Sequence, residues 1–486
     1  MAAETPFDDD DKLHEECGVY GVFASTDAAA FTALGLHALQ HRGQEGAGIV
    51  SFDGARFHSE RHTGLVGDNF AAGSEAIRCL PGQSAIGHTR YSTAGGTSHR
   101  NVQPLYAQIA GGGIALAHNG NLTNANVLRA ELVKNGAIFQ STSDTECILH
   151  LMSNSHQPTL IDRLADALRQ IEGAYSLVGL TDKELIGVRD PLGVRPLLLG
   201  ELDGAHILAS ETCALDIIGA KFVRDIDAGE LVVISAGDVK SLRPFPAMKK
   251  RFCIFELVYF ARPDSRVEGI SVYETRKRIG EELSREAPAN ADIVVPVPDS
   301  GVPAAIGFAA AARIPFELGI IRNHYVGRTF IEPTDHIRHL GVKLKHNANP
   351  ALLRGKRVVL VDDSIVRGTT SNKIVTMVRE AGAREVHMRI ASPPTTHSCF
   401  YGVNTPERDK LLASHMDIEA MRRHIEADSL AFVSMDGLYR AVGETSRRST
   451  SPQYCDACFS GEYPTRLTDQ DEGAPQLQLS LLTERK

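Results

Sequence analysis

The chain has 486 residues, 43% of them hydrophobic and 23% charged, which is typical of a folded protein with two to three domains. Its formal net charge of -9 argues against a general nucleic-acid-binding protein. Its apolar runs are too short to span a bilayer and its first residues are acidic, so we expect a cytoplasmic protein that binds neither nucleic acid nor membranes. The eight cysteines are therefore expected to be thiols, catalytic groups or metal ligands instead of disulfides.

Two regions of different periodicity follow one another. In the first, short apolar stretches alternate with Gly, Asn and Asp turns, which predicts many strands. Helical spacing appears within it at residues 29–43 and 159–173, and each helix is expected to end at a glycine. Residues 236–251, rich in Pro and Lys, are expected to be a connection. Beyond them, longer helices alternate with buried parallel-type strands, as at 291–301 and 356–368.

One strand of the second region runs into a pair of carboxylates, Asp362 and Asp363. Ligands bind at the carboxyl ends of such strands. The N–H groups at the start of the next helix, with the hydroxyls of Thr369 and Thr370, predict a phosphate cradle to which Gly368 allows close approach. The carboxylates could then hold vicinal hydroxyls or Mg²⁺. The alternative is a structural strand-to-helix turn with a capping carboxylate.

The whole string "VVLVDDSIVRGTT" resembles the phosphoribosylpyrophosphate signature of type I phosphoribosyltransferases. The resemblance implies a mainly parallel sheet and one Mg²⁺ per subunit, held with the substrate by Ser300, Asp362 and Asp363. It identifies "VVPVPDSGVPAA" as a pyrophosphate loop and residues 322–348 as a mobile loop, although a Pro-rich turn and a solvated surface loop are the alternatives. The residues it assigns to the substrate are Asp299, Ser300, Gly301, Asp362, Asp363, Ser364, Arg367, Gly368, Thr369 and Thr370, with Arg322, Arg328, Lys343 and Lys345 from the mobile loop.

Cys17 stands before an apolar strand near the start of the chain, as either a buried thiol or a nucleophile. After it come "LQHRGQEGAGI", "GHTRYSTAGG", "AHNGNLTN" and "STSDTE", which together resemble the glutaminase domain of class II amidotransferases. That fold is the N-terminal-nucleophile αββα sandwich of two sheets between helices. The resemblance implies removal of residues 1–16, which would leave Cys17 with a free α-amine. An amine with a pKa of about 7.7 to 8.0 can accept the thiol proton, whereas a peptide nitrogen cannot.

The same resemblance assigns roles to five further residues. Asn119 and Gly120 would form the oxyanion hole, Arg90 would bind the α-carboxylate of glutamine, and Asp144 would bind its α-ammonium. Arg42 matches a position near the active site, and the resemblance implies that it takes part in substrate binding. Taken singly, Asn-Gly suggests only a turn, and each charge only an ion pair. Two further groups are expected to pack or to support structure, namely His41, His88 and His118, and the stretch "RDPLGVRPL".

Four cysteines remain to be explained as a set, since "YCDACF" contains a C-x-x-C pair that needs two more ligands. Four thiolates can hold either Zn²⁺ or an iron-sulfur cluster, and chemistry alone does not decide between the two. The third alternative is that the four cysteines are unrelated free thiols. The resemblance to one subgroup of these enzymes implies a structural [4Fe-4S] cluster on Cys253, Cys399, Cys455 and Cys458. The others, Cys79, Cys147 and Cys213, are expected to be buried thiols.

Both regions together resemble the glutamine phosphoribosylpyrophosphate amidotransferase family, which opens de novo purine synthesis. Glutamine would be hydrolysed at Cys17 and its ammonia transferred to C1 of phosphoribosylpyrophosphate, giving 5-phosphoribosylamine, glutamate and pyrophosphate. The family implies a homotetramer inhibited by purine nucleotides. The expected division is a propeptide (1–16), a glutaminase domain (17–240), a phosphoribosyltransferase domain with the cluster cysteines (241–465) and a polar tail (466–486). Alternatives are another class II glutamine amidotransferase or a non-catalytic regulator that senses phosphoribosylpyrophosphate.

Overall fold

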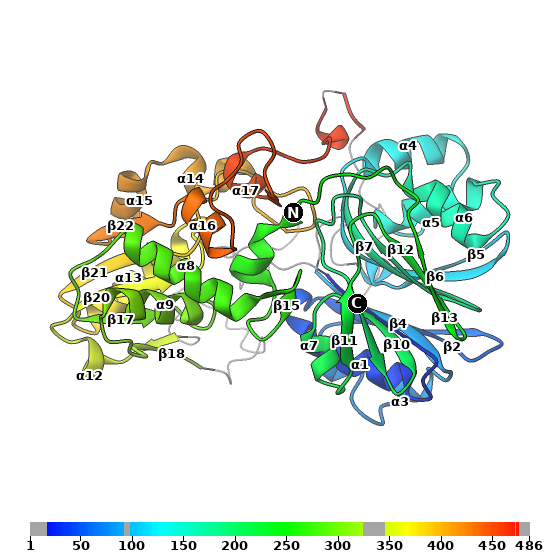
Figure 1. Ribbon diagram of the computed structural model, residues 1–486, viewed down its shortest axis with the longest axis horizontal. Helices are drawn as coiled ribbons and strands as arrows, with labels where there is room; N and C mark the ends of the chain where they lie inside the picture. The colour runs from blue at the N-terminus through cyan, green and yellow to red at the C-terminus, as the bar shows by residue number, and fades with distance from the viewer. Residues whose placement is uncertain (1–16, 92–97, 324–345, 472, 476–486) are drawn as a thin grey trace.

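The computed structural model describes residues 17–91, 98–323, 346–471 and 473–475, which form the two bodies that lie side by side in Figure 1. The body on the right is built from two large β-sheets, and the body on the left surrounds a smaller sheet. No helix in this described part is long and apolar enough to cross a membrane.

The first body contains two antiparallel sheets. The seven-stranded sheet has the order β11 (Lys221–Asp225), β9 (Leu198–Leu202), β10 (Ala205–Ala209), β1 (Gly18–Phe23), β4 (Ser84–Arg90), β2 (Gly46–Phe52) and β3 (Phe57–Thr63). The six-stranded sheet has the order β13 (Asp238–Leu242), β12 (Leu231–Ser235), β8 (Leu185–Arg189), β7 (Gly173–Thr181), β6 (Gly112–Leu122) and β5 (Leu105–Ile109).

Helices cover the outer face of each sheet, which gives the predicted αββα sandwich (Figure 1). The seven-stranded sheet carries α1 (Ala28–Ala38), α2 (Val66–Asn69), α3 (Glu75–Arg78) and α7 (Cys213–Asp216). The six-stranded sheet carries α4 (Ala125–Lys134), α5 (Thr145–Asn154) and α6 (Leu160–Leu168). Separate apolar clusters lie under α1, under α4 to α6, and between the two sheets.

Strand β1 shows how the sequence produces these layers. Successive side chains of a strand point to opposite faces. Tyr20 and Val22 accordingly join the cluster under α1, whereas Val19 joins the cluster between the sheets. The Tyr20 ring packs on Gly35 of α1, where a β-carbon would lie 2.4 Å from the ring. The apolar run predicted as a strand is therefore buried on both faces.

The second body is built on a parallel four-stranded sheet with helices on both faces. Its strand order is β17 (Ile293–Pro296), β20 (Arg357–Asp362), β21 (Glu385–Ile390) and β22 (Ser429–Phe432). One face packs against α8 (Val272–Glu286), α9 (Val302–Ala312) and α16 (Met435–Ala441). The other packs against α12 (Pro350–Leu353), α13 (Thr369–Glu380), α14 (Leu412–His415) and α15 (Ile418–His424).

The alternation of side chains assigns this sheet to two cores. Val359 and Val361 of β20 belong to the core with α8 and α9, whereas Val358 and Leu360 belong to the core with α13. Burial on both faces explains why these strands are continuous apolar runs, as predicted for a parallel sheet.

Shorter elements join the two bodies or extend them. They are η1 (Gln40–Arg42), η2 (His99–Asn101), β14 (Phe252–Cys253), the π-helix η3 (Glu256–Phe260), β15 (Arg266–Val267), β16 (Ile270–Ser271), β18 (Ile320–Arg322), β19 (His346–Ala348), η4 (Arg408–Lys410), β23 (Tyr454–Cys455), α17 (Ala457–Ser460) and η5 (Thr468–Gln470). Of the predicted polar tail, η5 packs on the first body, where the Asp469 carboxylate accepts hydrogen bonds from the N–H groups of Asn126 and Val127.

Three local predictions were wrong. Residues 236–251 are not wholly a connection, because β13 forms a hairpin with β12 around Gly237, whose φ is +81°. The helix predicted over 159–173 ends at Leu168, since Gly173 already pairs with Leu122 as the first residue of β7. Cys79 is exposed, because α3 contributes no buried residue to the core.

Candidate active sites and cysteine cluster

Cys17 lies directly before β1, the central strand of the seven-stranded sheet. Its Sγ is 3.5 Å from the carbonyl oxygen of Tyr91, and the N–H of Gly18 donates to Thr89 Oγ1 at 3.1 Å. Burial raises the pKa of the Cys17 thiol, while the nearby charge of Arg90 opposes that rise. A buried thiol therefore needs a base close at hand before it can attack a substrate.

Two opposite charges flank this thiol. Arg90 ends β4 and donates from Nη1 to the carbonyl oxygen of Asn101 at 3.0 Å. Asp144 precedes α5 and accepts a hydrogen bond from the N–H of Leu122 at 3.0 Å. Burial alone would raise the pKa of Asp144, but His118 and the backbone donors hold it below its usual value. One cation and one anion beside a thiol suit the two charged ends of an amino acid.

Asn119 and Gly120 lie near the end of β6 and are both buried. Neither the Nδ2 nor the Oδ1 atom of Asn119 has a hydrogen-bond partner in the described part of the chain. Gly120 has φ of +142°, and a β-carbon there would lie 2.0 Å from the carbonyl oxygen of Ala174. An unsatisfied buried amide is costly, about 1–3 kcal/mol, and a bound molecule that accepts a hydrogen bond from Asn119 would remove that cost.

The three histidines make supporting contacts. His88 Nε2 lies 3.0 Å from the carbonyl oxygen of His118, and burial lowers the pKa of His88 to about 3, so its ring is neutral. His118 Nδ1 is 3.2 Å from Thr145 Oγ1, and His41 Nε2 is 2.7 Å from Glu211 Oε1. These contacts agree with the packing role predicted for the three rings.

Arg42 is completely buried between the two bodies. Its Nε donates to Glu211 of the first body, and its Nη1 and Nη2 donate to Glu256 of the second at 3.2 and 2.6 Å. Arg195 joins the same group through Nη1, 3.4 Å from Glu256 Oε1. The predicted part of Arg42 in substrate binding stays a prediction, while its contacts join the two bodies.

Sequence reasoning missed the partners in this group. Glu211 and Glu256 lie in stretches without a recognised motif, so only their burial in the fold reveals them. Arg195 belongs to the stretch "RDPLGVRPL", which was predicted to be structural. Arg189 and Asp190 of that stretch do bind backbone groups, and Arg189 Nη2 also forms an ion pair with Glu268 of the second body at 2.5 Å. Arg195 likewise reaches across to Glu256, a contact that sequence spacing does not reveal.

The predicted phosphate site is formed where β17 and β20, neighbours in the parallel sheet, end side by side. Asp299, Ser300 and Gly301 connect β17 to α9, and a β-carbon on Gly301 would lie 2.3 Å from the carbonyl oxygen of Val361. Gly368 precedes α13 with φ of +83°. The two predicted loops thus lie at one edge of the sheet, each leading into the N-terminus of a helix, which favours anions.

The carboxylates of this site are held by neighbours. Asp363 accepts hydrogen bonds from the hydroxyls of Ser300 and, at 2.7 Å, Ser364. Asp362 is buried, and its Oδ1 accepts the N–H of Asp363 at 3.0 Å. Arg322 Nη1 lies 2.6 Å from Asp299 Oδ2. Arg367, Thr369 and Thr370 follow on the second loop and the start of α13, whereas Arg328, Lys343 and Lys345 lie outside the described residues.

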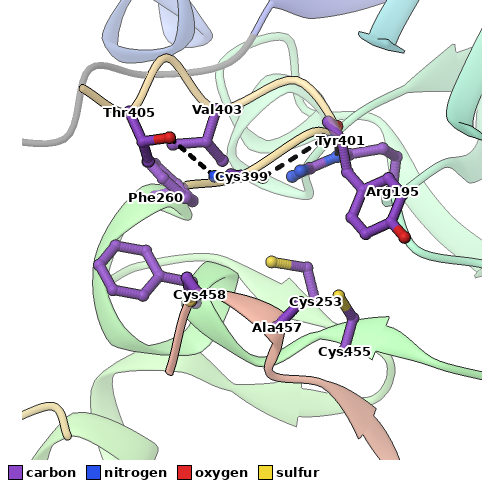
Figure 2. A pocket seen from close by; sticks show the side chains of 11 residues that line it. Arg195, Cys253, Phe260, Cys399, Tyr401, Val403, Thr405, Cys455, Ala457 and Cys458 are labelled. Carbon is purple, nitrogen blue, oxygen red and sulfur yellow. Dashed lines mark hydrogen bonds between the residues drawn. The ribbon is translucent and has the colours of Figure 1, made fainter. Parts of the chain in front are cut away.

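Four cysteines from three distant segments line one cavity (Figure 2). Cys253 and Cys455 are register partners in the parallel pair β14 and β23, and Cys458 follows in α17. Figure 2 shows Cys253 and Cys455 directed toward the loop that carries Cys399. The N–H of Tyr401 donates to Cys399 Sγ at 3.3 Å, the kind of bond that ligating sulfurs accept.

The donor set of this cavity fits a metal cluster. Its other lining residues are mostly apolar, namely Phe255, Phe260, Tyr401, Val403, Ala457, Arg195 and Thr405. Burial and the neighbouring thiols raise the pKa of Cys455 and Cys458 well above normal, so thiolates here require compensating positive charge. Among the described residues no three His, Cys, Asp or Glu side chains converge on a point that could hold a single ion. Four cysteine sulfurs around one space are a donor set that can hold either Zn²⁺ or an iron-sulfur cluster.

Comparisons with known proteins agree with both halves of the chain. Residues 88–216 match the glutamine amidotransferase domain, and residues 272–391 match the phosphoribosyl transferase domain. The chain is 59% identical over 480 residues to the amidophosphoribosyltransferase of Rhizobium etli, covering 98% of this chain and 97% of the relative. It is 47% identical over 472 residues to that of Bacillus subtilis, covering 97% and 98%.

Solved structures agree as well. One, described as the glutamine phosphoribosylpyrophosphate amidotransferase from B. subtilis complexed with ADP and GMP, matches 95% of this chain and 100% of that chain, with a TM-score of 0.89 and 46% identity. Another, described as the allosteric regulatory enzyme of purine biosynthesis, matches 96% and 100% with a TM-score of 0.90 and 46% identity.

Fold and sites together define a glutamine amidotransferase joined to a phosphoribosyltransferase, so the predicted fold class is confirmed. The matches at 47–59% identity over nearly the whole chain show to which family of such enzymes it belongs. The chain belongs to the amidophosphoribosyltransferase family. It is a glutamine phosphoribosylpyrophosphate amidotransferase enzyme, acting at the first step of purine synthesis, as predicted. The two alternative functions are thereby set aside.

Proposed function

We propose that residues 1–16 are a propeptide whose removal makes Cys17 the N-terminal nucleophile of glutamine hydrolysis. The observation that carries the assignment of Cys17 is its buried thiol directly before β1, with the charges of Arg90 and Asp144 beside it. The buried amide of Asn119, which has no partner in the described chain, supplies a donor in the same half. The glutamine α-carboxylate binds Arg90 and its α-ammonium binds Asp144, which orients the side-chain carboxamide toward Cys17.

The reaction then follows from the chemistry of these groups. Cys17 Sγ attacks the carboxamide carbon while the α-amine of the same residue takes the thiol proton. The negative oxygen that forms is bound by Asn119 Nδ2 and the N–H of Gly120. The protonated α-amine returns the proton to the leaving nitrogen, and ammonia departs. Water hydrolyses the thioester and releases glutamate.

At the second site, the loop from Asp299 to Gly301 binds pyrophosphate, and the loop from Ser364 to Thr370 binds the 5-phosphate, with the ribose hydroxyls on Asp362 and Asp363. Ammonia attacks C1, and pyrophosphate leaves to give 5-phosphoribosylamine. One Mg²⁺ per subunit would be held by Ser300 and the two carboxylates together with substrate oxygens, and it supplies positive charge for the departing pyrophosphate. Arg322, Arg328, Lys343 and Lys345 are proposed to close over this charge.

We also propose a [4Fe-4S] cluster on Cys253, Cys399, Cys455 and Cys458. The shared cavity supports it, and the four ligands tie together segments from residues 253 to 458. Its function is structural, since the reaction transfers an amino group and requires no electrons. A compartment that keeps cysteines reduced, the cytoplasm, suits eight cysteines without a disulfide in the structure.

Regulation and assembly complete the proposal. ADP and GMP are bound in the solved B. subtilis relative, and this supports purine nucleotides as feedback inhibitors of the present chain. We also propose that the protein is a homotetramer, and that its domain boundaries follow residues 16, 240 and 465. Strand β13 ends at Leu242, which supports a boundary close to the proposed one between the two halves.

Mass spectrometry of anaerobically purified protein tests the finer points. Under denaturing conditions the mature chain should begin at Cys17. Under native conditions it should carry four iron and four sulfide per subunit in a tetramer. A fully active enzyme that retains residues 1–16 would refute the N-terminal base, and one zinc per chain would refute the iron-sulfur assignment.

A further inference from the structure

A short loop of the second body, residues 400–402, packs directly on β6 of the first body, the strand that carries Asn119 and Gly120. Gly402 has φ of +114°, and a β-carbon there would lie 3.0 Å from the Cα and 3.1 Å from the carbonyl carbon of Gly120. Beside it, Asn121 Nδ2 donates to the carbonyl oxygen of Phe400 at 3.0 Å. The two halves therefore touch backbone to backbone at the residue that supplies an oxyanion donor.

This loop is itself firmly held. Tyr401 is buried, and its carbonyl oxygen accepts a hydrogen bond from Arg195 Nε at 2.8 Å. Its N–H donates to Cys399 Sγ, and its hydroxyl accepts the N–H of Thr465 at 3.1 Å. Arg195 and Thr465, from two other segments, thus hold the loop in place, so we expect a change within the loop to shift β6.

Gly120 has no room to retreat from the loop. On the β7 side, a β-carbon at Gly120 would lie only 2.0 Å from the carbonyl oxygen of Ala174. Its backbone is thus confined between β7 and Gly402. Any group added to Gly402 must displace either the loop or the strand, because close-packed interiors transmit such strain.

We propose that Phe400 and Gly402 are positioning residues of the glutaminase reaction, which set the Gly120 N–H and the Asn119 amide through contact with β6. The claim rests on the proposed oxyanion function of Asn119 and Gly120. Contacts made by the phosphoribosyltransferase half then directly affect the rate of glutamine hydrolysis. Glutamine binding is assigned to Arg90 and Asp144, and Asp144 meets β6 at Leu122 instead of at Gly120.

The test compares Gly402→Ala with Gly443→Ala. Gly443 is also in the second body and has φ of +98°, but a β-carbon there has no neighbour within 4 Å, so it controls for the cost of a positive φ. We expect Gly402→Ala to lower kcat for glutamine hydrolysis about tenfold to hundredfold, with KM changed less than about threefold. Ammonia-dependent synthesis should be unchanged in both variants.

A second variant guards against misfolding of the first. Asn121→Ser removes the hydrogen bond to Phe400 without adding bulk, and a smaller fall in kcat of about threefold to tenfold is expected. The γ-aldehyde analogue of glutamine, which forms an oxyanion adduct with Cys17, should bind Gly402→Ala more weakly by the same factor as kcat falls. Glutamate, which forms no such adduct, should bind as it does to the unaltered enzyme.

The outcomes separate the two claims. Unaltered kcat and aldehyde affinity in Gly402→Ala and Asn121→Ser would overturn the positioning role. A loss of kcat in Gly443→Ala equal to that in Gly402→Ala would overturn it as well. Glutamine hydrolysis that survives Cys17→Ala would instead overturn the proposed glutaminase site itself. A loss of kcat and aldehyde affinity confined to the variants at Gly402 and Asn121, with ammonia-dependent synthesis kept, supports the proposal.

Discussion

The substitution Glu256→Gln is expected to destabilise the junction between the two bodies strongly. Glu256 is fully buried and accepts three hydrogen bonds, from Arg42 Nη1 and Nη2 and from Arg195 Nη1. With Glu211, the group holds two positive and two negative charges. Glutamine preserves the shape but leaves one buried positive charge without compensation.

The magnitude follows from that imbalance. Removing one partner of a buried ion pair costs about 3–5 kcal/mol, because the remaining charge stays in a medium that solvates it poorly. Neither arginine can move to water, since both are completely buried. The double variant Glu256→Gln with Arg42→Gln restores neutrality, so its loss should be smaller than the sum of the two single losses.

The free energy of unfolding can be measured by urea denaturation followed by circular dichroism, since the chain has no tryptophan to report by fluorescence. Glu419→Gln, which breaks an exposed pair with Arg422, is the control and should leave the urea midpoint unchanged. A loss below about 1 kcal/mol in Glu256→Gln, or simple additivity in the double variant, would refute the argument.

Four further substitutions have defined expected outcomes. Asn119→Ala should lower the glutamine-dependent kcat about a hundredfold or more while ammonia-dependent synthesis persists, as steady-state rates will show. Asp144→Asn should raise the KM for glutamine with little change in ammonia-dependent activity. Because the pKa of Asp144 is lowered in the folded chain, its charge stabilises the fold above about pH 4 and this contribution is lost as the pH falls further, so urea midpoints should depend less on acid pH in Asp144→Asn. Asp363→Asn should weaken binding of phosphoribosylpyrophosphate, measured by calorimetry, and leave glutamine hydrolysis at its basal rate. Cys455→Ser should lower the iron content and the thermal midpoint together, and normal iron with normal stability would contradict the cluster assignment.

The sequence predicted the parts of the fold that depend on local pattern. The apolar runs around Val19 and Val359 became buried strands because their alternation and continuity match a two-sided core. Asp362 and Gly368 could be placed at the edge of a parallel sheet because strand ends and helix starts lie together in that architecture. The edge strand β13 was missed, since its residues are mostly exposed and carry no apolar alternation.

Contacts between distant segments could not be predicted. Nothing in the spacing of Arg42 and Glu256 shows that they meet, because 214 residues separate them and only the docking of the two bodies joins them. The same holds for Gly402 on Gly120. A glycine in a loop suggests only a turn, and its close approach to another backbone is visible in the fold alone.

The most direct test of the account is the rate of pyrophosphate release by Cys17→Ala, measured with glutamine and separately with ammonia. If Cys17 performs the hydrolysis and the second body performs the transfer, the glutamine-dependent rate should vanish and the ammonia-dependent rate should remain. A variant that still uses glutamine at the unaltered rate would contradict the assignment of Cys17. It would also contradict the assignment of glutamine hydrolysis to the first body and of ammonia transfer to the second.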